Sequence, residues 1–258
     1  MALIEHTLFG PIDRVKTAIE RLKAFEPADG YYLAFSGGKD SCVIKRLADM
    51  AGVKHDAHYA VTTIDPPELV RFIKEYHPDV EWVRAEKPLL MLLPDKGFPA
   101  RMKRWCCERY KEKGGSGRRV LTGIRWAESK KRSNRKMVEV CYTASKKDYL
   151  HVIIDWTESD VWDFIRQENV PYCSLYDEGF KRLGCIFCPM QSAWQKRRDR
   201  ERWPGFEKQF RRAFHKLWDN RKAKGNDSMS KRWKDADECF EWWMSNDPLP
   251  SQEDGLFT

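Results

Sequence analysis

Up to about residue 170, the hydrophobic residues follow two patterns that alternate along the chain. Short continuous apolar runs are typical of buried strands, whereas apolar residues spaced by three or four positions are typical of helices. Strands are expected at residues 31–35, 56–62, 80–84, 119–124 and 150–154. Helices are expected at residues 11–25, 41–51, 66–78 and 157–169. Because strands alternate with helices, the pattern predicts an α/β fold whose mainly parallel sheet has helices on both faces.

From about residue 190 the spacing is helical only, in a segment rich in Trp, Arg and Lys. We therefore expect two domains, an α/β domain over residues 1–192 and a helical annex with a loose C-terminal tail over residues 193–258. Gly52 is expected to close helix 41–51 as a C-cap. Thr157 is expected to open helix 157–169, with Asp160 in the capping-box position.

Composition places this 258-residue chain among globular proteins, with 41% hydrophobic and 33% charged residues. It has no apolar run of the roughly 18 residues that a membrane span needs. The N-terminus lacks a basic segment followed by an apolar one, so we expect no signal peptide, no membrane association and a cytoplasmic location.

The formal net charge of +8 is unevenly placed. Residues 101–136 hold fourteen Lys and Arg against three Glu, and residues 193–222 hold eleven against four acids. Such segments favour an anionic partner, nucleotide or nucleic acid, but they also occur as ordinary solvated surfaces. In the annex, aromatic residues spaced by three and four positions can either pack the helices or stack on bases.

A glycine-rich turn, "SGGKDS" (36–41), follows the strand "YYLAF" directly. Glycines at the carboxyl end of a strand leave main-chain N–H groups uncovered, and the following helix adds partial positive charge, so the turn predicts a phosphate cradle. Lys39 supplies a point charge for phosphate oxygens, and Asp40 can hold Mg²⁺, orient Lys39 or cap the helix. The candidate nucleotide-binding residues of this turn are Ser36, Gly37, Gly38, Lys39, Asp40 and Ser41.

The turn differs from a Walker A motif and resembles the PP-loop of the N-type ATP pyrophosphatases, above all their phosphoadenylyl sulfate (PAPS) reductase-like branch. The resemblance covers roughly residues 28–192. It extends through "TTIDPPE", "TGIRWAES", "IDWTESDVW", "VPYCSLYDEGF" and "LGCIFCP". It implies a Rossmann-like adenine nucleotide α-hydrolase fold that binds ATP or an adenylyl sulfate at the PP-loop.

Four of the eight cysteines form two close pairs, Cys106 with Cys107 and Cys185 with Cys188. Four thiolates suit Zn²⁺ or an iron–sulfur cluster, and adjacent cysteines reach neighbouring corners of a cluster more easily than one Zn²⁺. The CC…CxxC arrangement resembles that of adenylyl sulfate (APS) reductases, which implies a [4Fe–4S] cluster near the nucleotide site. Zinc, free thiols and disulfides remain alternatives.

The other cysteines have simpler expectations. Cys42, Cys141 and Cys173 lie in apolar runs and are expected to pack in the core. Cys239 lies in "DECFEWW", which shares Glu-Cys with the catalytic tail of the reductases but lacks the Gly and His that follow there. Cys239 is therefore either a packed helix cysteine or a catalytic one.

Further anion-binding candidates follow other strands. Gly123 and Arg125 lie in "TGIRWAES", where the Arg125 guanidinium can fork onto phosphate or sulfate. Glu128 can pair with Arg125 or help to bind a metal, and Asp65 follows the second strand at the level of a ribose or metal. The basic loop 130–136 can close over a polyanion or remain a solvated loop.

Three functions are compatible with these features. The first is an enzyme that cleaves ATP to AMP and pyrophosphate, with Mg²⁺, to activate a substrate for sulfur insertion; its acceptor would be tRNA or DNA and its sulfur donor a partner such as a cysteine desulfurase. The second is reduction of PAPS or APS to sulfite with a thioredoxin-like reductant. The third is a non-catalytic nucleotide-binding module of a larger complex. The sequence leaves the oligomeric state open, with a homodimer as one option.

Overall fold

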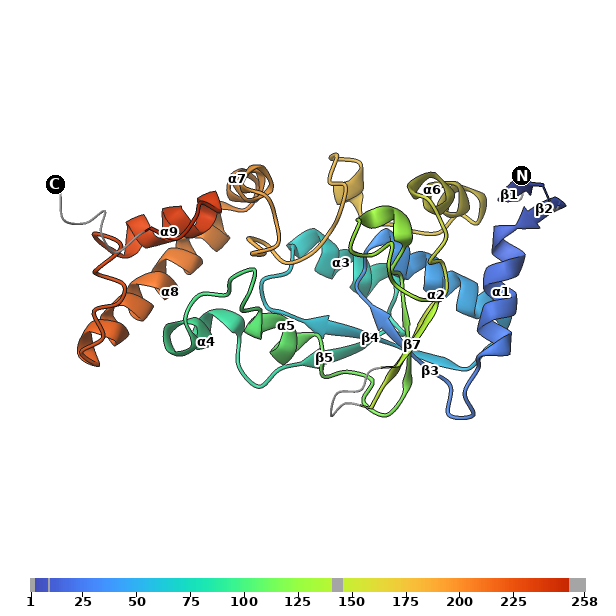
Figure 1. Ribbon diagram of the computed structural model, residues 1–258, viewed down its shortest axis with the longest axis horizontal. Helices are drawn as coiled ribbons and strands as arrows, with labels where there is room; N and C mark the ends of the chain where they lie inside the picture. The colour runs from blue at the N-terminus through green and yellow to red at the C-terminus, as the bar shows by residue number, and fades with distance from the viewer. Residues whose placement is uncertain (1–2, 9, 141–145, 251–258) are drawn as a thin grey trace. The chain divides into compact units, whose positions relative to one another are not determined.

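The computed structural model describes residues 3–8, 10–140 and 146–250 (Figure 1). The chain forms two compact units, each assembled from separate segments. Unit 1 comprises Met1–Val61, Pro67–Arg84 and Lys113–Gly184, and unit 2 comprises Thr62–Pro66, Ala85–Glu112 and Cys185–Thr258. These units are not the two domains expected from composition, because two segments that precede residue 192 group with the helical annex.

Unit 1 contains a six-stranded sheet with the order β5-β4-β3-β6-β8-β7. The strands are β3 (Tyr31–Phe35), β4 (His55–Val61), β5 (Glu81–Arg84), β6 (Arg119–Thr122), β7 (Val138–Val140) and β8 (Asp148–His151). All neighbouring pairs are parallel except β7 with β8. The expected α/β fold with a mainly parallel sheet is confirmed. Strand β7 and the small hairpin of β1 (Ile4–Thr7) and β2 (Gly10–Asp13) were not anticipated.

Two helices of unit 1 begin at side-chain caps. Helix α1 (Arg14–Ala24) starts later than the expected residue 11, because the Asp13 carboxylate accepts the Lys16 N–H at 2.9 Å as its N-cap. Helix α2 (Lys39–Ala51) ends at Gly52 in the left-handed conformation, as expected. The remaining elements are α3 (Pro67–Tyr76), α6 (Glu158–Gln167) and the short 3₁₀ helices η1 (Trp126–Glu128) and η2 (Ser174–Tyr176). The capping box of Thr157 and Asp160 opens α6.

The order of the strands determines where a ligand can bind. In the sheet, strand β3 lies between β4 and β6. The chain first continues from β3 to β4 on one side, and only later places β6 on the other side. This reversal is a topological switch point, and ligands of open α/β sheets bind beyond the carboxyl ends of the strands there. The turn after β3 and the turn after β6 therefore lie at the same edge of the sheet.

Unit 2 is mainly helical. Its helices are α4 (Leu89–Lys96), α5 (Trp105–Tyr110), α7 (Ala193–Arg202), α8 (Pro204–Ala223) and α9 (Ala236–Ser245). Phe210, Phe214, Phe240 and Trp243 are buried and form a chain of ring contacts between α8 and α9. The aromatic spacing of the annex therefore serves packing for these residues. Within the described ranges, no helix is both long enough and apolar enough to cross a bilayer.

Candidate nucleotide site and cysteine group

The turn after β3 needs glycine at position 37 and has little room for a side chain at position 38. Gly37 has a φ of +70°, and a Cβ there would lie 2.7 Å from methyl carbons of Leu69 and Ile73. Gly38 is the N-cap of α2, and its Cβ would crowd Ser36 Oγ at 3.3 Å and Tyr176 Oη at 3.4 Å. The backbone therefore approaches this edge of the sheet without side chains in the way.

Two serines hold the turn in shape. Ser41 Oγ donates to the Gly38 carbonyl at 2.8 Å, and Ser36 Oγ lies 3.1 Å from Ser41 Oγ. Within the described part of the chain, the main-chain N–H groups of Gly37 and Asp40 have no hydrogen-bond partner. Both lie at the start of the thirteen-residue helix α2, where an anion is favoured.

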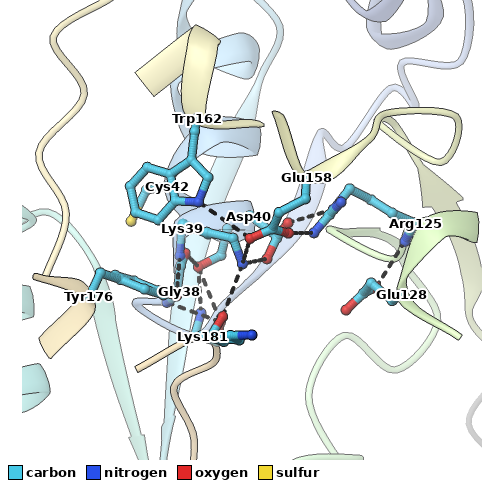
Figure 2. Close-up of polar contacts among 12 residues, drawn as sticks. Gly38, Lys39, Asp40, Cys42, Arg125, Glu128, Glu158, Trp162, Tyr176 and Lys181 are labelled. Carbon is cyan, nitrogen blue, oxygen red and sulfur yellow. Dashed lines mark hydrogen bonds and ion pairs between the residues drawn. The ribbon is translucent and has the colours of Figure 1, made fainter. Parts of the chain in front are cut away.

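Lys39 is 4% exposed, which is unusual for a lysine. Its Nζ lies 3.4 Å from Asp40 Oδ2 and 3.3 Å from Glu158 Oε1, and it lies 5.5 Å from the centre of the Tyr176 ring. Figure 2 shows the ammonium group pointing to these carboxylates. The cation therefore lies at the carboxyl edge of the sheet, balanced by two acids.

Arg125 binds the same two carboxylates from the neighbouring strand. Its Nε donates to Asp40 Oδ1 at 2.7 Å and its Nη2 donates to Glu158 Oε2 at 2.6 Å (Figure 2). Its side chain is 2% exposed. Burial opposes the charge, but the carboxylates of Asp40 and Glu158 outweigh it and raise the pKa of Arg125. In this arrangement the guanidinium faces protein carboxylates, and its contact with phosphate or sulfate stays a prediction.

Gly123 explains how the two turns approach each other. A Cβ at Gly123 would lie 2.8 Å from Asp40 Cβ and 3.2 Å from Ile44 Cδ1. The absence of a side chain lets the end of β6 lie against the start of α2. Gly123 thus serves close packing of the site, and its contact with a nucleotide stays a prediction.

Sequence reasoning did not single out Glu158 or Tyr176, although both lie in segments that carry the family resemblance. Glu158, at the start of α6, completes the cluster around Lys39 and Arg125. Tyr176 Oη accepts the Lys39 N–H at 2.9 Å. Its ring meets Trp162 at 5.3 Å between centroids. Burial raises the pKa of Tyr176, so its hydroxyl stays protonated at neutral pH.

Two other expected positions, Asp65 and Glu128, have different surroundings. Asp65 belongs to unit 2, where its carboxylate accepts the N–H of Thr62 at 2.8 Å and the Thr62 hydroxyl at 2.7 Å. Glu128 accepts the Arg125 main-chain N–H at 3.0 Å and pairs with Arg132 of the basic loop. A role for these residues in binding nucleotide or metal stays a prediction.

The cysteine group (Cys106, Cys107, Cys185 and Cys188) lies entirely in unit 2, and each member is partly exposed. The thiol of Cys106 hydrogen-bonds to Cys107, which raises the pKa of Cys106 and lowers that of Cys107 to about 6. Negative charge on Cys185 and Cys188 also raises the pKa of Cys106. Negative charge on Cys185 likewise raises the pKa of Lys111. Cys185 Sγ donates to Thr62 Oγ1 at 3.4 Å, on the side of Asp65.

The cysteine group has the chemistry of a metal-cluster ligand set. Four cysteines in one unit, two adjacent in α5 and two separated by two residues, provide the number of thiolates that an iron–sulfur cluster requires. Among the described residues, no three or more Cys, His, Asp or Glu side chains are already drawn together as a metal site. The four ligands therefore stay a prediction.

The remaining cysteines of the described chain are buried. Cys42 and Cys173 are each 1% exposed, in accord with core packing. Cys239 is 0% exposed on α9, and burial raises its pKa to about 12. It is a packed helix cysteine in this conformation. Cys141 lies outside the described residues.

Comparisons with known proteins agree with this architecture. The family model of the phosphoadenosine phosphosulfate reductase domain matches residues 30–191. An adenosine 5′-phosphosulfate reductase of Staphylococcus haemolyticus is 29% identical over 184 residues, which cover 64% of this chain and 70% of that protein. An uncharacterized protein of Methanocaldococcus jannaschii is 28% identical over 218 residues, which cover 80% of this chain. The match spans 42% of the length of that archaeal relative.

Among solved structures, a crystal structure of phosphoadenylyl-sulfate reductase from Candida auris in complex with phosphate shares the fold. The TM-score is 0.53, with 17% sequence identity over 67% of this chain and 89% of that one. This likeness confirms the fold expected from the PP-loop resemblance.

Proposed function

Since the chain belongs to the phosphoadenosine phosphosulfate reductase family, we propose that it is an adenine-nucleotide enzyme that cleaves ATP to AMP and pyrophosphate to activate an acceptor for sulfur insertion. The observation that carries the proposal is Lys39. Lys39 is only 4% exposed and is the first residue of helix α2. It follows a turn that requires glycine at position 37 and that leaves main-chain N–H groups uncovered. This arrangement suits the phosphate tail of a nucleotide.

In the proposed reaction, an oxygen of the acceptor attacks the α-phosphorus of ATP. A new P–O bond forms, the bond from the α-phosphorus to the bridging oxygen breaks, and its electron pair leaves with pyrophosphate. The Lys39 ammonium and the N–H groups of Gly37 and Asp40 would stabilise the charge that develops on pyrophosphate. The outer sulfur of a donor persulfide then forms a C–S bond with the acceptor, while the C–O bond to AMP breaks and AMP leaves. A second thiol of the donor protein attacks the remaining S–S bond, which frees the thiolated acceptor and leaves a disulfide on the donor.

Two further groups are part of the proposal. Mg²⁺ usually takes one or two carboxylates together with substrate phosphates, and the Asp40 carboxylate at the start of α2 suits that role. The cysteine group would hold a [4Fe–4S] cluster, which supplies sulfur or electron transfer when bound. Thr62 and Lys111 would lie beside it, because both already interact with Cys185.

The acceptor in this proposal is a nucleic acid, tRNA or DNA, in keeping with the formal charge of +8. The sulfur donor would be a cysteine desulfurase or a protein of similar chemistry.

A second candidate is reduction of APS or PAPS to sulfite, which the adenosine 5′-phosphosulfate reductase relative favours. That reaction needs a mobile nucleophilic thiol. Cys239 is fully buried in a helix and its thiol pKa is raised, which argues against it in this role.

Product analysis separates the candidates. Protein prepared without oxygen is incubated with Mg²⁺, a nucleic-acid pool and either ATP or an adenylyl sulfate. AMP and pyrophosphate from ATP, lost in Lys39→Met, would support the proposal. Sulfite from APS or PAPS with thioredoxin, lost in Cys239→Ser, would replace it with the reductase. Nucleotide binding with neither product would indicate a non-catalytic module.

A further inference from the structure

We propose that unit 2 carries a binding surface for single-stranded nucleic acid, formed by the outer face of α7 and the turn before α5. Its residues are Met102, Lys103, Arg104, Trp194, Arg197 and Arg198. As the docking site of the acceptor, this surface rests on the proposed function; as a binding site it can be tested without turnover.

Helix α7 has two faces with different tasks. On the inner face, Lys196 is 1% exposed and donates to Trp243 O at 2.5 Å and Asn246 Oδ1 at 2.8 Å. Asp199, one turn later, accepts the N–H of Phe187 at 3.0 Å. These two buried polar residues attach α7 to the rest of unit 2, so the opposite face of the helix is exposed.

The outer face presents an aromatic ring among cations. Trp194, Arg197 and Arg198 are spaced i, i+3 and i+4 and therefore lie on one side of the helix. Trp194 is 61% exposed, and the guanidinium of Arg198 lies 5.8 Å from its ring centre. An aromatic ring exposed to this degree beside an arginine offers a platform on which a base can stack.

The turn at residues 100–104 extends this surface. Reciprocal hydrogen bonds between the main chains of Ala100 and Lys103, at 3.1 and 3.2 Å, hold the turn, and Met102 at its tip is 98% exposed. Arg101 fixes it next to α7 by donating to Pro189 O at 3.2 Å and Gln191 O at 3.1 Å. Lys103 and Arg104 are thus held near the N-terminus of α7.

The composition of the surface selects the class of ligand. Four basic side chains suit phosphates, while Trp194 and Met102 offer apolar area that a duplex, with its bases stacked inside, cannot use. Single strands and unpaired loops expose their bases to such a platform. The surface also adjoins the cysteine group, since Arg104 is the N-cap of α5, whose first turn carries Cys106 and Cys107. An acceptor bound here would lie close to the proposed sulfur chemistry.

Fluorescence anisotropy of labelled oligonucleotides on the full chain tests the surface. Single-stranded DNA and RNA of about 20 nucleotides are compared with the matching duplexes over a range of salt. Trp194→Ala should weaken single-strand binding about 5- to 100-fold, whereas Trp194→Phe should retain most of it. Arg197→Gln should reduce the slope of log Kd against log salt by about 0.7.

Control variants distinguish this surface from general charge. Tyr76→Ala removes an exposed aromatic residue of unit 1, and Lys74→Gln removes an exposed cation of the same helix; both should bind normally. Preference for the RNA or the DNA strand would identify the acceptor. Equal affinity for duplexes, normal binding by Trp194→Ala, or no salt-dependent binding would overturn the proposal. ATP binding, measured as the shift in melting temperature that ATP causes, should be unchanged in Trp194→Ala. Loss of oligonucleotide binding alone would therefore not count against the proposed nucleotide site.

Discussion

The hydroxyl of Tyr176 accepts a hydrogen bond from the main-chain N–H of Lys39, at a distance of 2.9 Å. That N–H is the first of helix α2, one of the donors that a phosphate at this turn would use. A tyrosine from a distant segment therefore satisfies the first main-chain N–H of α2. Nucleotide binding at this amide would have to replace the phenol.

Replacement of Tyr176 tests this relationship. Tyr176→Phe leaves the Lys39 N–H without its partner, so we expect the free energy of unfolding of the ligand-free protein to fall by about 1–3 kcal/mol. ATP should then bind more tightly, because phosphate no longer competes with the hydroxyl. Urea unfolding and isothermal titration calorimetry measure the two effects, with Tyr172→Phe as the matched control. Weaker ATP binding in Tyr176→Phe would instead mean that the hydroxyl itself contacts the ligand.

Lys39 should be essential for turnover. Lys39→Met keeps the length of the side chain but removes the charge next to the expected phosphates, and pyrophosphate release should fall about 10²- to 10³-fold. Lys74→Met, at an exposed position of α3, should have normal activity. Normal pyrophosphate release by Lys39→Met would place the chemistry elsewhere in the protein.

Glu158 should oppose nucleotide binding. Its carboxylate lies 3.3 Å from Lys39 Nζ and reduces the positive charge available to phosphate. Glu158→Gln should therefore tighten ATP binding about two- to fivefold, the range expected for a partly exposed ion pair. Asp163→Asn, on the same helix α6, should leave the affinity unchanged. Weaker binding in Glu158→Gln would indicate that the carboxylate positions Arg125 or Mg²⁺ for the ligand.

The cysteine group should account for bound iron. Protein purified without oxygen should contain about four iron atoms and four acid-labile sulfides per chain. Serine at any of the four positions should remove most of this iron, whereas Cys173→Ala and Cys239→Ser should retain it, because both cysteines are buried and neither belongs to the two close pairs. Iron analysis and visible absorption measure the result; stoichiometric zinc without iron would select the alternative metal.

Stability should decrease in mild acid because of buried histidines. Burial, helped by the charge of Lys45, lowers the pKa of His77 to about 4, and burial likewise lowers that of His151 to about 4. An unfolded histidine has a pKa of about 6.5, so the unfolded state binds more protons as the pH falls from about 6.5 to 4. Each histidine should therefore cost up to about 1.4 kcal/mol of stability per pH unit in that window, and nothing above it.

Urea unfolding at several pH values measures this slope. His77→Gln removes one titrating group and should flatten the curve, whereas His6→Gln, on the exposed strand β1, should not. An unchanged slope in His77→Gln would show that carboxylates, and not this histidine, govern the acid sensitivity.

Sequence reasoning was most successful where the signal is local. The glycines of the PP-loop, the capping box at Thr157 and the C-cap at Gly52 each act on neighbouring residues, and the structure has all three as expected. The apolar run before the PP-loop likewise predicted β3 correctly.

Contacts between distant segments were harder to anticipate. Tyr176 is separated from Lys39 by 137 positions, so no periodicity links the two residues. Helix α4 was missed because its sequence, "LLMLLPDK", is apolar on all sides and contains Pro94, which hides the helical spacing. Composition also gave no sign that Asp65 shares a unit with the cysteines, since only the folded chain joins Asp65, Thr62 and Cys185.

The division of the chain into two units restricts how this protein can be altered. The backbone passes from one unit to the other five times, after residues 61, 66, 84, 112 and 184. A gene fragment that ends before residue 185 would encode Cys106 and Cys107 without the helices that complete their surroundings. Neither unit can therefore be produced from one continuous stretch of the gene, and the two units have to be expressed and redesigned together.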